Sequence, residues 1–299
     1  MKVLLTGVTG QVGWRLARAL PALAEVVGVT RDTLDLTRPD TIRQVIRAIR
    51  PDVIVNAAGC THVDHVESHA QVAHAVNAVA PGIMAEEALR LGALLVHYSS
   101  GYVFDGTKAG AYTEADQPAP INEYGRSKLR GEEAIAAVGG ACLILRASWV
   151  YDVRARNFVL TMLRLAAARD ELAVVDDQIG SPTWAGAIAQ ATCTLLRDPA
   201  RAKAQAGIYN LAAHGAVSRY DFTQDIMQIT TDLRAGRTTP RLNRIKTPDF
   251  PLPAPRPLNC VLDSARLVHT FDVPLPHWQQ QLRACLAELD PAAVQPGPT

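Results

Sequence analysis

Gly7-Val8-Thr9-Gly10-Gln11-Val12-Gly13 is the stretch of sequence that decides the fold of this chain. It follows a short apolar run, Lys2 to Thr6, and opens a segment, Trp14 to Leu20, in which apolar residues recur at helical spacing. Glycines here permit a tight turn and let backbone N–H groups approach a pyrophosphate at the helix N-terminus. A bare glycine triplet is also found in ordinary turns. The order strand, glycine-rich turn, helix is nevertheless the context that a dinucleotide-binding fingerprint requires, and it predicts such a site.

The composition is typical of a globular protein with a large core. The 299 residues are 48% hydrophobic and 20% charged, which suits one large domain or two unequal ones. A formal net charge of +1 provides no basic field for nucleic acid or an anionic membrane surface. We expect neither a signal peptide nor a membrane span, because the first apolar run ends early at Gly7. The five cysteines are scattered and form no CxxC motif, so we expect reduced thiols and a cytoplasmic protein.

The tip of the second predicted strand bears on the choice of cofactor. This strand, Glu25 to Val29, ends at Thr30-Arg31. An acid at this position binds the ribose 2′-hydroxyl of NADH, whereas an arginine accommodates the 2′-phosphate of NADPH. Arg31 therefore favours NADPH. NADH stays open, since Asp32 follows at once and a solvated Arg31 is the plain alternative.

Strands and helices alternate through the first half of the chain. This order predicts an α/β protein with a doubly wound, parallel Rossmann-type sheet. We predict a dinucleotide-binding domain over 1–150 and a smaller substrate-binding lobe over 151–299, with segments near 183–200 and 258–262 returning to the first domain. The tail, 291–299, is rich in Pro and Ala and is expected to be disordered. The elements expected are helices over 37–50, 70–90, 157–168 and 183–196, and strands over 52–56, 93–98 and 141–145.

Three residues indicate the reduction of a ketone. Tyr124 and Lys128 stand four apart, on one face of a helix. An ammonium beside a phenol favours the phenolate, so that the phenol can pass a proton near neutral pH. Ser100 follows the fourth strand, at the sheet edge where ligands bind, and its hydroxyl can bond a substrate carbonyl. An exposed Tyr–Lys pair and a turn-forming serine are the alternatives, and the joint occurrence after a glycine fingerprint favours catalysis.

Several blocks together resemble the dTDP-4-dehydrorhamnose reductase family, in the extended branch of the short-chain dehydrogenase/reductase superfamily. The likeness runs from Lys2 to about Leu289, and the blocks Ser-Trp-Val-Tyr and Asp-Gln-x-Gly-x-Pro-Thr are the most specific. The matching segments are 2–13, 56–58, 97–104, 122–128, 146–151, 157–158, 175–183 and 256–259.

This resemblance implies NADPH-dependent reduction of the C4 ketone of dTDP-4-dehydro-L-rhamnose to dTDP-L-rhamnose. Tyr124 would donate the proton, Lys128 would lower its pKa and hold the nicotinamide ribose, and Ser100 would fix the carbonyl oxygen. The expected cofactor contacts are Gly7, Gly10, Gln11, Val12, Gly13, Arg31, Asp35, Leu36, Gly59, Cys60, Thr61, Tyr98, Tyr124 and Lys128. The expected substrate contacts are Ser100, Gly101, Trp149, Asn157 and Arg256, the last as a bidentate donor to the diphosphate. A plain surface charge is the alternative for Arg256.

Two departures from the family pattern keep alternatives open. Gly101 stands where the family usually has Asp, which leaves another dTDP-4-keto-6-deoxysugar as a rival substrate. Some members dimerise through a metal held by an acid after the glycine turn, where this chain has Arg15. We therefore expect no metal and leave a homodimer open. A non-catalytic, dinucleotide-binding regulatory subunit is the rival from another class.

Two further segments have ordinary interpretations. Four histidines, His62, His65, His69 and His74, lie close together, but no Cys or carboxylate partner completes a metal site, so a polar helix face is favoured. The proline-rich run over 247–257 resembles a polyproline ligand in isolation. Inside a folded enzyme, a stiff loop is favoured.

Overall fold

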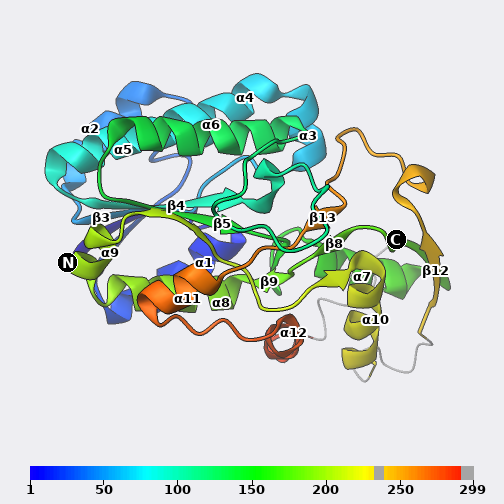
Figure 1. Cartoon of the computed structure of the whole chain (residues 1–299). Coiled ribbons are helices and arrows are strands. Elements are labelled where there is room, and N and C mark those ends of the chain that lie inside the picture. The colour runs from blue at the N-terminus through cyan, green and yellow to red at the C-terminus, as the bar shows by residue number, and fades with distance from the viewer. Residues whose placement is uncertain (232–238, 291–299) are drawn as a thin grey trace.

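Within residues 1–231 and 239–290, which the computed structural model describes, the centre of the molecule is a six-stranded sheet (Figure 1). Its strand order is β10-β5-β4-β3-β1-β2, and every neighbouring pair is parallel. The predicted doubly wound α/β class is confirmed. The strands are β1 (Lys2–Thr6), β2 (Glu25–Val29), β3 (Val53–Asn56), β4 (Leu94–Ser100), β5 (Cys142–Ala147) and β10 (Gly207–Asn210).

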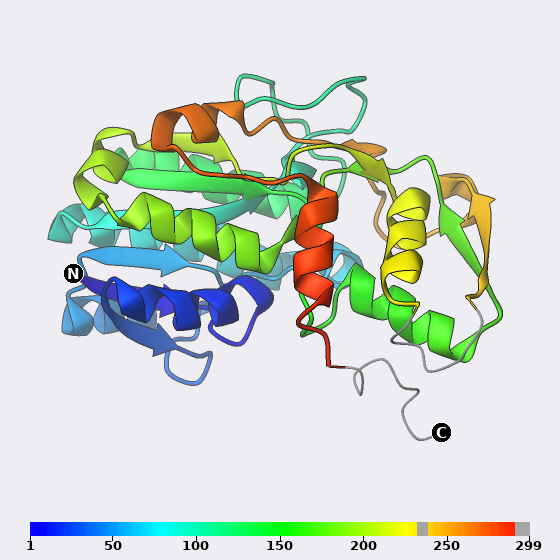
Figure 2. The same ribbon diagram turned by 90° about the horizontal axis from the view of Figure 1, so that it is seen from below.

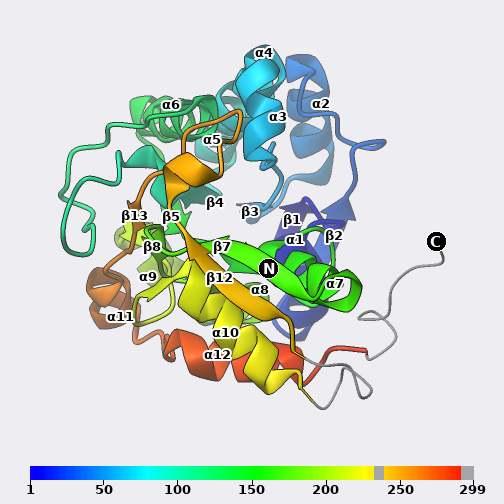
Figure 3. The same ribbon diagram turned by 90° about the vertical axis from the view of Figure 1, so that its right-hand side faces the viewer.

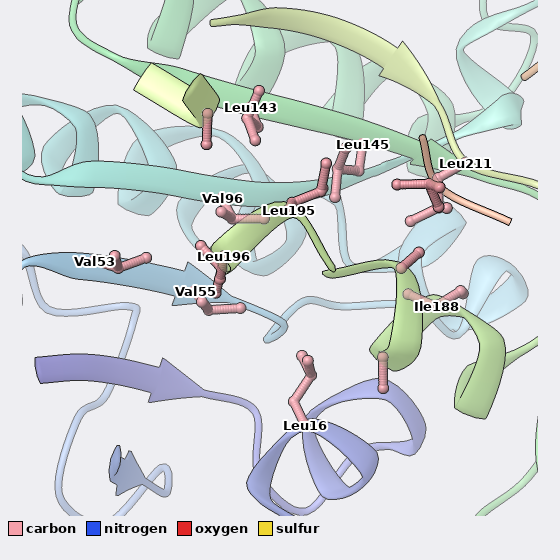
Figure 4. Close-up of a cluster of buried hydrophobic side chains, with 14 of the residues drawn as sticks. Leu16, Val53, Val55, Val96, Leu143, Leu145, Ile188, Leu195, Leu196 and Leu211 are labelled. Carbon is pink, nitrogen blue, oxygen red and sulfur yellow. The ribbon is translucent and has the colours of Figure 1, made fainter. Parts of the chain in front are cut away.

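Helices cover both faces of this sheet because successive strand residues point to opposite sides. Val3 and Leu5 belong to one buried cluster, and Leu4 between them belongs to another. The first cluster is covered by α1 (Gln11–Ala19), α8 (Ala185–Leu196), α9 (Pro199–Ala204) and α11 (Ala265–Phe271), as Figures 1 and 2 show. The second is covered by α2 (Pro39–Ile49), α5 (Ala80–Leu91) and α6 (Glu123–Val138). In Figure 4, Leu16 of α1 and Ile188 of α8 lie over the strand residues.

The predicted helix over 70–90 is present and contains one irregular turn. It consists of α4 (Ala70–His74), a π-helical turn over Ala75–Val79, and α5, and it is preceded by α3 (Val63–Ser68). Pro81 explains this turn. Its backbone nitrogen has no hydrogen to donate to the carbonyl of Asn77, and its ring would clash with that carbonyl in a regular α-helix. The buried Asn77 side chain uses the wider turn to bond the backbone N–H and C=O of Cys60 (2.8 and 3.0 Å) and the hydroxyl of Ser127 (2.9 Å).

A second lobe packs around its own core beyond the carboxyl ends of the sheet (Figure 3). Tyr151, Phe222 and Trp278 are among its buried side chains. Its helices are α7 (Phe158–Ala168), α10 (Arg219–Ile229) and α12 (Trp278–Leu286). Its strand pairs are β7 (Glu171–Val175) with β12 (Arg241–Ile245), β6 (Val150–Tyr151) with β9 (Thr183–Trp184), and β8 (Ile179–Gly180) with both β11 (Val217–Ser218) and β13 (Asn259–Cys260).

Segments from the second half of the chain pack against the main sheet and extend it. Within 183–200, α8 packs against the sheet. Within 258–262, β13 pairs with β8 outside the main sheet, and the assignment of this segment to the first domain stays a prediction. The sixth strand is β10 instead, a four-residue edge strand that is too short to give a periodic signal. The division at residue 150 itself stays a prediction.

Two expectations concern the ends of the chain and the membrane. The tail over 291–299 lies outside the described residues. Among the residues that are described, no helix combines the length and the apolar character needed to cross a bilayer.

Candidate active site

Two adjoining pockets lie beyond the carboxyl ends of the central strands. The chain reverses its direction of winding between β1 and β3, which is where doubly wound sheets bind ligands. The first pocket is lined from the glycine turn, the tip of β2 and the loop after β3, and the second from the same turn, the end of β4, α6 and the second lobe. Both share Gly10 and Ala57–Gly59, so one elongated ligand can span them.

The glycine turn requires glycine for steric reasons at two of its positions. Gly7 has φ +71°, and a Cβ there would lie 2.5 Å from the carbonyl oxygen of Ala57. A Cβ on Gly13 would lie 2.0 Å from the carbonyl oxygen of Gly7. Gly7 lines the first pocket, whereas Gly13 lines neither and allows α1 to approach the turn.

The first pocket contains most of the residues predicted for the adenosine half of the cofactor. Arg31, Asp35, Leu36, Gly59 and Cys60 all line it. The carboxylate of Asp35 accepts hydrogen bonds from the backbone N–H and the hydroxyl of Thr37 (2.9 and 2.7 Å), which lower the pKa of Asp35. The exposed Arg31 side chain stands at the tip of β2, as its position in the sequence predicted.

The structure brings the three predicted catalytic residues together. Ser100, Tyr124 and Lys128 line the second pocket, along with Gln11, Val12, Thr61 and Tyr98. Ser100 is the last residue of β4, and Tyr124 and Lys128 lie in the first turns of α6, whose N-cap is Asn122. The ring of Tyr124 meets Tyr102 edge to face, with 5.7 Å between centroids.

The expected effect of Lys128 on the pKa of Tyr124 stays a prediction, because burial and Ser100 are the influences that the structure shows on this phenol. Burial raises the pKa of Tyr124, and a hydrogen bond with Ser100 opposes that rise in part. The Lys128 ammonium instead donates to the carbonyl oxygen of Tyr98 (2.6 Å) and lies 3.4 Å from Nε2 of His97. A phenol with a raised pKa stays protonated at neutral pH, which is the form that can donate a proton.

Lys128 itself has an environment that the sequence did not reveal. Burial lowers the pKa of Lys128 to about 8. The neighbouring His97 is fully buried in β4, and burial together with the Lys128 charge holds the pKa of His97 well below its usual value. Nδ1 of His97 lies 3.1 Å from the amide nitrogen of Asn56, which anchors the imidazole. Asn56 and His97 belong to segments that resemble the family, but no local pattern indicated that His97 lies beside Lys128.

On the substrate side, Trp149 lines the second pocket as expected. Its backbone has φ +43°, a conformation that costs energy for any residue but glycine and that is frequent at functional sites. The indole lies against Gly180, where a Cβ would be 2.5 Å from the ring. Arg219, which sequence reasoning missed, also lines this pocket, and its guanidinium carbon lies 3.5 Å from the Trp149 ring centroid.

The other three predicted substrate residues do not line either pocket. Gly101 lies against Leu262, whose side chain would be 3.4 Å from a Cβ at the glycine position. Asn157 caps α7 by accepting from the N–H of Leu160 (3.1 Å). Arg256 forms an ion pair with Asp64 (2.7 Å). Their proposed contacts with substrate stay predictions.

The clustered histidines have structural partners. His65 and His69 stack with 3.8 Å between centroids, and Nε2 of His62 lies 2.9 Å from a guanidinium nitrogen of Arg156. In the described part of the chain, no group of three or more His, Cys, Asp or Glu side chains is arranged to hold a metal ion.

These features define a Rossmann-type protein of the extended short-chain dehydrogenase/reductase class. The UDP-glucose 4-epimerase of Thermus thermophilus shares the fold, with a TM-score of 0.77 at 18% identity over 96% of this chain and 98% of that one.

The family described as RmlD substrate binding domain matches residues 1–290, and this chain belongs to it. The dTDP-4-dehydrorhamnose reductase of Burkholderia thailandensis is 43% identical over 97% of this chain and 99% of that protein. The enzyme of the same name from Escherichia coli K12 is 39% identical over 97% and 98%. A solved dTDP-4-dehydrorhamnose reductase from Bacillus anthracis, in complex with NADP, has a TM-score of 0.89 and 31% identity over 96% and 99%.

Proposed function

We propose that this chain uses NADPH to reduce the C4 ketone of dTDP-4-dehydro-L-rhamnose to dTDP-L-rhamnose, in nucleotide-sugar synthesis. One observation carries the proposal. Ser100, Tyr124 and Lys128 line the second pocket, which adjoins the first pocket on the glycine turn. The names of full-length relatives, and NADP in a solved one, support the substrate and the cofactor.

The residues present fit a phosphorylated dinucleotide. Gly7 provides a backbone cradle that a Cβ would fill, and Arg31 offers a cation at the tip of β2 for a 2′-phosphate. When bound, the nicotinamide supplies the hydride for the sugar carbon. The proposed cofactor contacts are those predicted from the sequence, except that Gly13 acts through the packing of α1 rather than by contact.

The side chains of the second pocket supply the acid and the orientation. Tyr124 donates its proton to the oxygen that was the ketone, because its raised pKa keeps the phenol protonated until then. The Ser100 hydroxyl holds that oxygen and the phenol in register. The Lys128 ammonium, which is fixed by the Tyr98 carbonyl, lines the same pocket as Tyr124 and favours the phenolate that forms.

The rival functions have weaker support. Gly101 was the reason to consider a different keto-deoxysugar, but it lies against Leu262 and does not line the pocket. A non-catalytic regulatory subunit would not need Ser100, Tyr124, Lys128 and Trp149 around one pocket.

Following NADPH and NADH oxidation with enzymatically made dTDP-4-dehydro-L-rhamnose tests the proposal. A panel of other dTDP-4-keto-6-deoxysugars serves as the comparison. We expect turnover with the first substrate and preference for NADPH. A purified chain that binds NADPH but oxidises none with any keto-sugar would refute the enzymatic function, and faster turnover of another sugar would correct the substrate.

The oligomeric state and the cellular location stay proposals. A homodimer is supported only by family resemblance, and light scattering of the purified chain tests it. A cytoplasmic location is supported by the five cysteines, none of which is in a disulfide, and fractionation of cells tests it.

A further inference from the structure

The second pocket has an uneven distribution of charge. Its lining contains Lys128, Arg156 and Arg219, and no Asp or Glu from the described residues contributes to it. Lys128 is engaged by the Tyr98 carbonyl, and Arg156 lies at hydrogen-bond distance from His62. Arg219 is the third cation, and the described part of the chain places no carboxylate within ion-pair distance of it.

Arg219 is held in place by aromatic rings rather than by an acid. Its guanidinium carbon lies 3.5 Å from the Trp149 centroid and 4.6 Å from that of Phe158. Tyr102, which meets the Tyr124 ring edge to face, hydrogen-bonds the Arg219 side chain. The guanidinium therefore has a fixed plane, with donors left over, in the pocket that also contains the proposed catalytic phenol.

The electrostatics of this position favour an incoming anion. Burial lowers the pKa of Arg219, which means that the protein environment alone does not compensate the charge. Arg256, the residue expected to meet the diphosphate, is also nearby, but Asp64 neutralises it at 2.7 Å and it does not line the pocket. Of these two arginines, only Arg219 combines pocket access with an uncompensated charge.

We propose that Arg219, stacked on Trp149, receives the diphosphate of the nucleotide-sugar and thereby sets the specificity of the substrate pocket. This inference rests on the proposed function, in which the diphosphate is the charged group of the substrate. A guanidinium fork suits two phosphate oxygens, and its stacking on an indole leaves the N–H edge free for them. The strained backbone of Trp149 is consistent with this role, because it positions the ring beneath the guanidinium.

Binding of dTDP and of thymidine to Arg219→Gln and Arg219→Lys, measured by calorimetry, tests the inference. We expect Arg219→Gln to weaken dTDP binding about 10- to 100-fold, from the loss of a charge-assisted contact, and to leave thymidine binding unchanged. Arg219→Lys should lose less. Arg244→Gln is the matched control, because Arg244 also stacks on a ring (3.9 Å from Tyr220) but pairs with Asp221 and lies outside the pocket.

The outcomes separate this inference from the proposed function. Unchanged dTDP affinity in Arg219→Gln, or an equal loss for thymidine, would overturn the inference even if the wild-type chain reduces the keto-sugar. Selective loss of dTDP affinity would support it even if no keto-sugar is reduced. NADPH affinity should be unchanged in Arg219→Gln, because Arg219 is not among the proposed cofactor contacts; if it falls in parallel with dTDP affinity, the variant is misfolded, and the Arg219→Lys result decides.

Discussion

At the scale of single residues, the hydroxyl group of Tyr124 should be required for turnover but not for binding of NADPH. We expect Tyr124→Phe to lower kcat by about 10²- to 10⁴-fold, the range of a lost general acid, because phenylalanine has no hydroxyl to donate. NADPH affinity should be retained, as measured by fluorescence titration. Tyr112→Phe is the control, since Tyr112 donates to Asp105 (2.7 Å) away from the pocket and should keep its turnover. Substantial residual activity in Tyr124→Phe would remove Tyr124 from the mechanism.

Lys128 gives the reaction a pH limit. Its pKa of about 8, lowered by burial, means that the side chain is an ammonium below that pH and neutral above it. If the charged form is required, kcat/KM should fall about tenfold per pH unit above roughly pH 8. Tyr124 adds no limit at neutral pH because its pKa is raised. A pH profile of kcat/KM checks this, and a flat alkaline limb would show that the charge on Lys128 is dispensable.

We expect Arg31 to determine the choice between the two nicotinamide cofactors. It lines the first pocket at the tip of β2, and its side chain is exposed. Arg31→Gln should raise the KM for NADPH about tenfold, since one charge-assisted contact with the 2′-phosphate is lost. The KM for NADH should stay the same, because NADH has no phosphate there. An equal rise for both cofactors would assign Arg31 to another part of the dinucleotide.

At the scale of elements, the close packing of α1 against the glycine turn couples the stability of the protein to cofactor binding. A Cβ at Gly13 would lie 2.0 Å from the Gly7 carbonyl oxygen, so Gly13→Ala must push the helix away. We expect a loss of about 1–3 kcal/mol in the free energy of unfolding, as for overpacking, and weaker NADPH binding.

Denaturant unfolding and NADPH titration check this coupling. The same exchange at Gly110, where a Cβ would meet no atom within 4 Å, should change neither quantity. If Gly13→Ala binds NADPH normally, the turn tolerates movement of α1 and the steric argument fails.

At the scale of the whole molecule, Arg15 joins the two lobes. From α1 it donates to the carboxylate of Asp152, which is 0% exposed, and it reaches Glu288 after α12 (2.6 Å). Trp184 also donates to Asp152 (3.2 Å). Arg15 is thus the cation of an ion pair that joins the two lobes.

Arg15→Met should therefore destabilise the chain. Breaking a buried pair typically costs about 3–5 kcal/mol, and partial exposure to water reduces the expected loss here to about 2–3 kcal/mol. Arg18→Met, on the same helix, is the control, because Arg18 stacks on Trp14 (3.6 Å) at the surface. Equal unfolding free energies for the two variants would show that the pair contributes nothing.

Local patterns were sufficient for the fold class and for most of the site. The glycine turn, the helix bearing Tyr124 and Lys128, and Ser100 at the end of β4 were all predictable, since each depends on spacing within one element and parallel strands end at a common edge. Arg31 was predictable for the same reason, because the tip of the second strand can be located from the sequence.

Only the tertiary structure decided which charges remain available in the pocket. The sequence around Arg219 and Arg256 does not show which of them is neutralised. Asp64, 192 residues before Arg256, neutralises Arg256 and not Arg219. Similarly, β10 completes the sheet and His97 adjoins Lys128 through contacts between distant segments. The sequence by itself determined the elements and the chemistry that each one carries. Which side chains meet, and therefore which of them keep an uncompensated charge, depends on long-range packing and burial, which no local pattern records.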